Sequence, residues 1–367
     1  MDQITRKMKK ILCLIDTLGI GGAERQMVGL ATLLKQKGYD VDLVAYHKDE
    51  FYAPIARAGG IDPVFLSVKD SQWSKLKAVR QFIKQRHGYD WVIAYKGGPN
   101  AIGCLLKLIG MRFKLIVSER ITNTTIGGKK RLFKLYRFAD YVVPNAYSQG
   151  EFLSANFPWM KKKVVPISNF TDTNYFSPAE CQSSEKQVIL TAARVARQKN
   201  TMRYLEAISV LKKDGSDNIH FKWYGDVQRG EEDYARAVKD KVEELGIGDM
   251  IEFFPNVPNI VDYYRECTFF CLPSTFEGFP NVVCEAMSCG KPVICGRVCD
   301  NARIVSEGKN GLLFDPKDVN DIVNTLKTMI SMPNEQRKQW GRESRNLAVN
   351  MLSEEAFINK YIDLIER

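Results

Sequence analysis

The feature that most constrains this chain is an apolar–loop–helix–apolar pattern between Phe269 and Val298. An apolar run over 269–272 predicts a buried strand, and a loop over 275–280 follows it. A helix is predicted from about Asn281 to Cys289, and a second apolar strand over 292–295 comes behind it. Such βαβ units bind ligands at the carboxyl ends of their strands. We therefore expect a ligand site at the loop over 275–280.

Two carboxylates flank the start of this helix. Glu277 lies in the loop and Glu285 lies about one turn into the helix, so both side chains can face one ligand. The backbone N–H groups of Asn281, Val282 and Val283 point the same way and favour a phosphate. The alternative is a helix cap and a surface charge, because acidic residues are favoured at helix N-termini in any case.

Length and composition indicate a two-domain globular protein. The chain has 367 residues, of which 45% are hydrophobic and 26% are charged, enough for two domains that each bury a core. Nine cysteines show no metal-ligand spacing and mostly fall in predicted core elements, so we expect reduced thiols in a cytosolic protein. The net charge of +10 suits anionic partners, namely nucleotide phosphates, lipid headgroups or nucleic acid.

The N-terminus does not read as a targeting segment. Its apolar part, 11–15, is too short for a signal peptide and ends at Asp16. No run approaches the ~18 apolar residues of a membrane-spanning helix. We expect a cytoplasmic protein whose contact with a membrane is peripheral.

Strands and helices alternate along the whole chain, which predicts parallel, doubly wound sheets. In the first half, strands are predicted over 9–16, 41–46, 64–68, 91–95, 114–118, 141–144 and 164–168, and helices over 75–86, 101–109, 129–138 and 147–155. A polar segment without periodicity, 173–186, is the predicted linker. In the second half, strands are predicted over 188–193, 220–224, 251–254, 269–272, 292–295 and 312–314, and helices over 202–213, 232–245, 260–265, 282–289 and 356–365.

The segment from Glu277 to Glu285 resembles the E-x7-E motif of the retaining GT-B glycosyltransferases of family 4. This resemblance implies an α/β fold of two Rossmann-like, doubly wound domains that face a central cleft. Residues 1–172 would form an acceptor-binding domain and residues 187–352 a nucleotide-sugar-binding domain. The last helix, within 353–367, would pack back on the first domain.

Further motifs of the second domain support the resemblance. Arg194 and Lys199, which follow the first strand, match the R-x4-K motif and would pair with the leaving diphosphate. Solvated surface charge is the alternative. Asn200 stands where the family usually has Gly. Gly225 matches a G-x-G turn, in which Val227 replaces the second Gly.

The resemblance also assigns roles around the donor. Asn256 and Val257 would hold the base through backbone groups, and Gly278 and Phe279 would also belong to the donor-binding site. Asn281, Val282 and Val283 would meet the distal phosphate. Glu285 would bind the ribose hydroxyls, whereas Glu277 is placed to meet only the transferred sugar.

The acceptor side is less marked. Gly22 belongs to a Gly-rich turn after the first strand, which in the family borders the acceptor and the diphosphate. Glu119, within Ser118-Glu119-Arg120, is the predicted acceptor base, and a structural salt bridge with Arg120 is the alternative. No nucleophile is evident for double displacement, so we expect front-face transfer without a metal.

Taken together, the resemblance implies transfer of a hexose or N-acetylhexosamine from a UDP-sugar to a polyprenyl-diphosphate-linked glycan of a bacterial surface. GDP- and ADP-sugars stay open as donors, and no cofactor besides the donor is expected. The rivals are a UDP-sugar epimerase and a non-enzymatic sugar-binding protein. The sequence leaves the oligomeric state open.

Two basic-aromatic stretches, 129–138 and 157–163, predict contact with an anionic membrane surface. The alternative for the first is a core-packed helix with a solvated basic face. Nucleic acid is not expected, because no recognised nucleic-acid motif is present.

Overall fold

The structure is a computed structural model that describes residues 8–69, 71–120, 125–179, 186–216 and 218–367. The chain divides into two compact units. The first comprises Met1–Asn169 together with Phe357–Arg367, and the second comprises Phe170–Ala356.

The first unit contains a six-stranded parallel sheet in the order β3-β2-β1-β4-β5-β6. From β1 the chain first winds outward to β3 and then returns beside β1 to start β4, so the strand order reverses between β1 and β4. The strands are β1 Lys10–Ile15, β2 Asp40–Ala45, β3 Val64–Phe65, β4 Trp91–Tyr95, β5 Lys114–Ser118 and β6 Tyr141–Val142.

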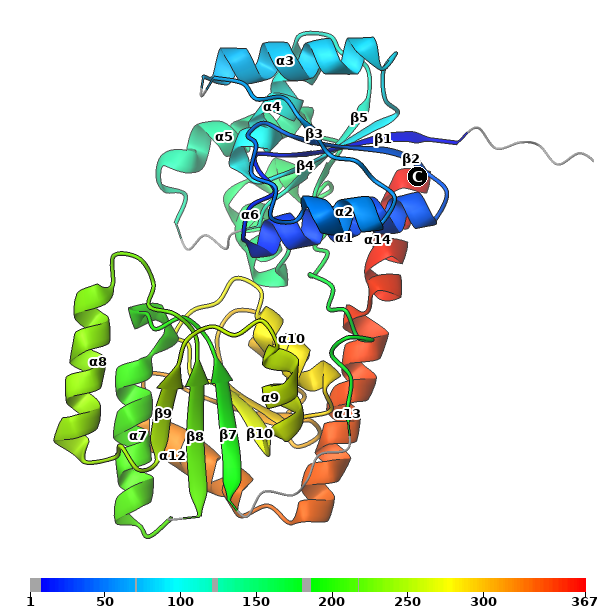
Figure 1. Ribbon diagram of the computed structural model, residues 1–367. Helices are drawn as coiled ribbons and strands as arrows, with labels where there is room; N and C mark the ends of the chain where they lie inside the picture. Colours follow the sequence, from blue (N-terminus) through cyan, green and yellow to red (C-terminus); the bar gives the residue numbers. More distant parts are fainter. Residues whose placement is uncertain (1–7, 70, 121–124, 180–185, 217) are drawn as a thin grey trace, which may run out of the picture. The chain divides into compact units, whose positions relative to one another are not determined.

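Helices cover both faces of this sheet. The helices α1 and α14 lie on one face and α3 lies on the opposite face (Figure 1). The predicted helix over 129–138 is broken into a short α-helix between two 3-10 turns. The bounds are α1 Gly22–Gln36, α2 Ala53–Ala58, α3 Gln72–Gln85, α4 Gly97–Leu108, η1 Gly127–Lys129, α5 Lys130–Leu135, η2 Tyr136–Phe138, α6 Tyr147–Asn156, η3 Pro158–Met160 and α14 Glu354–Glu366.

The C-terminal helix α14 contacts the first unit through buried and partly buried hydrogen bonds and an ion pair. The hydroxyls of Tyr361 and Tyr95 are 2.8 Å apart, and both side chains are fully buried. Lys9 Nζ lies 2.7 Å from the carbonyl of Ile365 and 2.9 Å from Glu366, which also accepts from Tyr39.

The second unit repeats the architecture, with a parallel sheet in the order β12-β11-β10-β7-β8-β9. Its strand order reverses between β10 and β7. The strands are β7 Gln187–Ala192, β8 Ile219–Tyr224, β9 Ile251–Phe254, β10 Phe269–Leu272, β11 Val293–Gly296 and β12 Gly311–Phe314.

Two apolar cores lie on the two faces of this second sheet. One contains buried side chains of α7, α8 and α12, and the other contains those of α9 and α10 and the end of α13. The bounds are η4 Arg197–Lys199, α7 Thr201–Lys213, α8 Glu232–Leu245, α9 Ile260–Glu266, α10 Asn281–Ser288, α11 Asn301–Ile304, α12 Val319–Ile330 and α13 Asn334–Leu352.

The predicted strand over 164–168 is wrong. Val164 makes a single bridge to Val142, and the residues behind it are extended without forming a strand. Pro166 interrupts this segment and has no N–H to donate to a ladder. The partner strand β6 is itself only two residues long.

The linker was expected over 173–186, but the chain passes from the first unit to the second between Asn169 and Phe170. Phe176 packs edge-on against Tyr264 at 5.9 Å between ring centroids. Arg345 Nη1 donates to the carbonyls of Thr173 and Phe176 at 2.7 and 3.0 Å. These contacts make the start of the segment part of the second unit, whereas residues 180–185 lie outside the described residues.

Candidate active site

The predicted donor site lies where the strand order of the second sheet reverses. Because β7 and β10 are parallel neighbours, the loops that follow them meet at one edge of the sheet. Parallel α/β sheets bind their ligands at such switch points. Arg194 and Lys199 come from the loop after β7, and Glu277 comes from the loop after β10.

The structure brings Lys199 and Glu277 into direct contact. Lys199 Nζ lies 2.6 Å from Glu277 Oε1, with 14% and 8% of the two side chains exposed. Glu277 was expected to meet only the transferred sugar, and its contact with Lys199 was not predicted. Lys199 was itself predicted to bind the diphosphate.

Backbone hydrogen bonds join the same two loops. Thr275 N donates to the carbonyl of Gln198 at 2.9 Å, and Gln198 Nε2 donates to the carbonyl of Phe276 at 2.7 Å. Asn200 Nδ2 donates to the carbonyls of Pro273 and Pro316 at 3.1 and 2.7 Å. The ion pair is thus held in a frame that does not depend on the pair itself.

Asn200 explains why Gly is usual at this position. Its backbone is left-handed, with φ 61° and ψ 32°, a conformation that Gly adopts freely and Asn tolerates better than other residues. The replacement therefore keeps the loop shape and adds the two side-chain hydrogen bonds. The loop therefore accommodates Asn200 in place of the Gly that is usual in the family.

Gly225 allows the loop after β8 to pass directly against the loop after β7. Its φ is 153°, and an added Cβ would lie 2.1 Å from the carbonyl oxygen of Ala193. Beyond it, Val195 N donates to the carbonyl of Asp226 at 3.0 Å. Asp226 Oδ1 in turn accepts from Asn256 N at 3.0 Å, which places the Asn256 turn beside the Gly225 turn.

Glu285 is buried on α10, in the second turn of the helix. The hydroxyl of Tyr264, on α9, donates to Glu285 Oε2 at 3.1 Å. Burial, followed by the charge of Glu285, raises the pKa of Tyr264 well above its ordinary value. Tyr264 therefore stays protonated and orients the carboxylate.

The start of α10 offers fewer free amides than predicted. Asn281 N donates to the carbonyl of Phe279 and Val283 N donates to that of Pro280, both at 3.0 Å. Pro280 has φ −83° and ψ 71°, values typical of an inverse γ-turn. Two of the three predicted phosphate donors thus have partners within the turn, and Val282 N is the remaining one.

Arg194 is exposed, and within the described part of the chain its guanidinium makes no hydrogen bond or ion pair. It is therefore available to an anionic ligand. Arg197, in the same loop, differs in that its guanidinium lies 4.9 Å from the ring centroid of Tyr234.

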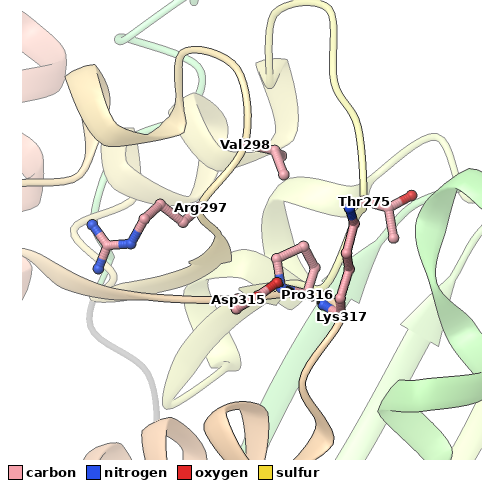
Figure 2. Close-up of a pocket in the computed structure, with 6 residues that line it drawn as sticks. All are labelled: Thr275, Arg297, Val298, Asp315, Pro316 and Lys317. Carbon is pink, nitrogen blue, oxygen red and sulfur yellow. Dashed lines mark hydrogen bonds between the residues drawn. The ribbon is translucent and has the colours of Figure 1, made fainter.

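A pocket of about 370 Å³ borders the loop that carries Glu277. Its lining comes from the carboxyl ends of β10, β11 and β12 and comprises Thr275, Arg297, Val298, Asp315, Pro316 and Lys317. Lys317 extends toward Thr275, and the Arg297 guanidinium points away from both (Figure 2); that guanidinium binds Glu307. Sequence reasoning predicted a ligand site at the loop that contains Thr275 but missed the other lining residues, although Arg297 lies two positions after the predicted strand over 292–295.

In the first unit, Glu119 is engaged inside the fold. Its Oε1 accepts from the hydroxyl of Tyr136 and, at 3.3 Å, from Asn100 Nδ2. Burial raises the pKa of Glu119. Arg120 does not pair with it and instead donates to Asn169 and lies 4.3 Å from the Tyr95 ring centroid. The acceptor-base role of Glu119 stays a prediction.

A charged cluster at the β1/β4 switch point was not predicted. Gly22 begins α1 there, and the buried Glu24 of the same turn pairs with Lys96. Lys96 Nζ also lies 3.2 Å from Asp16. Asp16 directly follows β1 and Lys96 directly follows β4, so their positions at neighbouring strand ends were the available signal.

No group of three His, Cys, Asp or Glu side chains with metal-ligand geometry occurs among the described residues. None of the described helices is both long and apolar enough to cross a membrane. Of the eight cysteines that the structure describes, all but Cys299 are buried.

Two family models match the chain one after the other. Residues 20–175 match Glycosyltransferase Family 4, and residues 176–347 match Glycosyl transferases group 1. Together they cover every strand except β1 and every predicted donor-site residue. The chain is a glycosyltransferase.

Relatives of this glycosyltransferase include two bacterial proteins that it matches over most of both lengths. It is 27% identical to the GalNAc-α-(1→4)-GalNAc-α-(1→3)-diNAcBac-PP-undecaprenol α-1,4-N-acetyl-D-galactosaminyltransferase of Campylobacter jejuni, covering 89% of this chain and 90% of the relative. It is 26% identical to an uncharacterized glycosyltransferase of Haemophilus influenzae, covering 97% and 98%.

Solved structures of other proteins share the fold. A glycosyltransferase from Rickettsia africae aligns with a TM-score of 0.86 at 17% identity, covering 98% of each chain. Anabaena HepE in complex with UDP aligns with a TM-score of 0.85 at 18% identity, covering 98% of this chain and all of the other. The glycosyltransferase therefore has the predicted GT-B fold, with one Rossmann-like sheet in each unit.

Proposed function

We propose that this glycosyltransferase moves a hexose or N-acetylhexosamine from a UDP-sugar to a polyprenyl-diphosphate-linked glycan, with retention of the anomeric configuration. The observation that carries the proposal is the grouping of Arg194, Lys199 and Glu277 at the β10/β7 switch point, with Glu285 buried on the helix that follows. The complex of a structural neighbour, Anabaena HepE, with UDP supports the choice of nucleotide.

The cations of this site would act on the leaving group. Negative charge builds on the diphosphate as its bond to the sugar breaks, and preorganised cations stabilise that charge most in a partly buried site. Lys199 is mostly buried. Arg194 is exposed, and its guanidinium makes no hydrogen bond or ion pair with the described residues. These two side chains supply the counter-charge from the protein, so we propose transfer that does not depend on a divalent metal.

The contact of Glu277 with Lys199 bears on how the anomeric configuration would be retained. Retention by double displacement uses two carboxyl groups about 5 Å apart. The group in contact with Glu277 is the ammonium of Lys199 rather than a second carboxylate. This favours front-face transfer, in which the leaving phosphate takes the acceptor proton.

The acceptor class rests on the relatives. The Campylobacter jejuni relative is named for a glycan linked to undecaprenol diphosphate. A lipid carrier of this kind would bring the enzyme to the inner face of the membrane. In the first unit, Lys130, Arg131, Lys134 and Arg137 are exposed while Phe133 and Tyr136 are buried. We propose that this basic face rests on anionic lipid.

The test is release of UDP from a panel of UDP-, GDP- and ADP-sugars, with and without a polyprenyl-diphosphate-linked glycan and with EDTA present throughout. We expect release from a UDP-sugar that depends on the acceptor, and a product whose anomeric configuration by NMR equals that of the donor. Release that requires an added divalent metal, or an inverted product, would contradict the proposal.

A further inference from the structure

Lys199 and Glu277 neutralise each other when no donor is bound. Their charged atoms are 2.6 Å apart and both side chains are mostly buried. A buried charge that loses its partner is strongly unfavourable. Any ligand that binds Lys199 must therefore either replace Glu277 or share the ammonium with it.

The two loops hold these side chains in place independently of their charges. Four hydrogen bonds from Gln198, Asn200 and Thr275 join the loop after β7 to the loop after β10 and to the end of β12. Removing the charge of Glu277 leaves this frame intact. Lys199 would then stay at the site without its internal partner.

From this arrangement we propose that Glu277 holds the place of the donor's diphosphate on Lys199. Binding of the diphosphate takes over the ammonium and releases the Glu277 carboxylate toward the sugar. The inference rests on the proposed function and deepens it, because it makes phosphate binding the event that frees the sugar-facing carboxylate.

This exchange of partners on Lys199 predicts the direction in which Glu277 changes the affinity for UDP. Glu277 opposes binding of a nucleoside diphosphate, since the phosphate must compete with a carboxylate for the same ammonium, while the same carboxylate supports turnover. Removing its charge should tighten the affinity for UDP and slow the reaction. If Glu277 only positioned Lys199, the removal of its charge would instead weaken UDP binding.

Calorimetric titration with UDP and with uridine separates these cases. For Glu277→Gln we expect the Kd for UDP to fall roughly tenfold, in keeping with loss of one charge near a partly buried anion site. The Kd for uridine, which carries no phosphate, should not change. Glu277→Asp keeps the charge and should bind UDP like the wild type, and Lys199→Met should bind it more weakly.

Glu335→Gln is the matched control, because it removes a carboxylate from an exposed pair with Lys338 on α13. Equal or weaker UDP binding by a folded Glu277→Gln variant would overturn the inference while leaving the proposed function standing. So would tighter binding of uridine to the same degree as UDP. Failure of the wild type to bind UDP, GDP or ADP would overturn the proposed function and the inference with it.

Discussion

At the residue scale, Asn200 fixes the backbone on which Lys199 is mounted. We expect Asn200→Ala to lower the free energy of unfolding by about 2–4 kcal/mol, since it loses two buried hydrogen bonds and places Cβ in a left-handed conformation. Asn200→Gly loses only the hydrogen bonds and should be milder by about 1 kcal/mol. Urea unfolding of both variants is the measurement, and equal losses would show that the left-handed backbone contributes nothing.

Residue types and spacing were enough to predict that the loops carrying Lys199 and Glu277 lie at the same edge of the second sheet. Arg194, Lys199 and Glu277 follow strands whose order the βαβ pattern implied. The ion pair between Lys199 and Glu277 was not predictable, because it depends on how two loops of irregular backbone are joined. The hydrogen bond from Tyr136 to Glu119 was not predictable either, because the two residues are 17 positions apart in the sequence and Tyr136 lies in a segment expected to face a membrane.

At the element scale, burial of α4, of β10 and of the end of α10 controls the chemistry of the cysteines that these elements carry. Burial raises the pKa of Cys104, Cys271 and Cys289 to about 12 from an ordinary value of 9.0. The thiolate is the reactive form, so at pH 8 we expect these thiols to resist Ellman's reagent in the native protein and to react at once in guanidinium. The free energy of unfolding should also fall above about pH 9, where only the unfolded thiols ionise. Fast reaction of the native thiols would contradict the described burial.

The basic segment over 129–138 is the element that we expect to meet the membrane. Each exposed basic residue near an anionic surface contributes about 1 kcal/mol, screened over about 8 Å at physiological ionic strength. Changing Lys130, Arg131 and Lys134 to Glu should therefore abolish sedimentation with anionic vesicles, and salt should weaken sedimentation of the wild type. Lys163 is not a suitable target, because its Nζ donates to the carbonyls of Arg137 and Ala139.

A matched control makes the same change of charge elsewhere. Lys213, Lys239 and Lys309 are exposed in the second unit, and their replacement by Glu should leave sedimentation largely as it is. If both triple variants lost sedimentation equally, the effect would depend on the net charge of the protein and not on the segment over 129–138. Equal sedimentation of the wild type with neutral and anionic vesicles would contradict the proposed surface.

Strands were easier to predict than helices in this chain. The strands β10 and β11 of the second sheet are continuous apolar runs, and the expected bounds of all six strands lie within a residue or two of those observed. The helix α13 was missed because its apolar stripe is narrow. At Gly341 this helix passes close to the chain around Gly290, because an added Cβ would lie 2.2 Å from the carbonyl oxygen of Gly290. A contact made through glycine leaves no hydrophobic pattern in the sequence.

At the scale of the whole molecule, the chain begins and ends in the same unit. The buried hydroxyl pair of Tyr95 and Tyr361 joins β4 to α14 at 2.8 Å. Tyr361→Phe leaves the Tyr95 hydroxyl without this partner, and we expect a loss of about 1–3 kcal/mol from the free energy of unfolding. The exposed Tyr175→Phe is the control and should lie within about 0.5 kcal/mol of the wild type. Equal stability of the two variants would mean that the hydroxyl pair of Tyr95 and Tyr361 does not stabilise the first unit.

The central claim is that Arg194 and Lys199 stabilise the leaving diphosphate. The most direct measurement is the rate of acceptor-dependent UDP release by the Arg194→Ala/Lys199→Ala double variant, with folding checked by circular dichroism. Each charge-assisted contact that strengthens in the transition state contributes roughly 2–4 kcal/mol, so we predict a fall in kcat of about a thousandfold or more. Turnover at the wild-type rate would contradict the account.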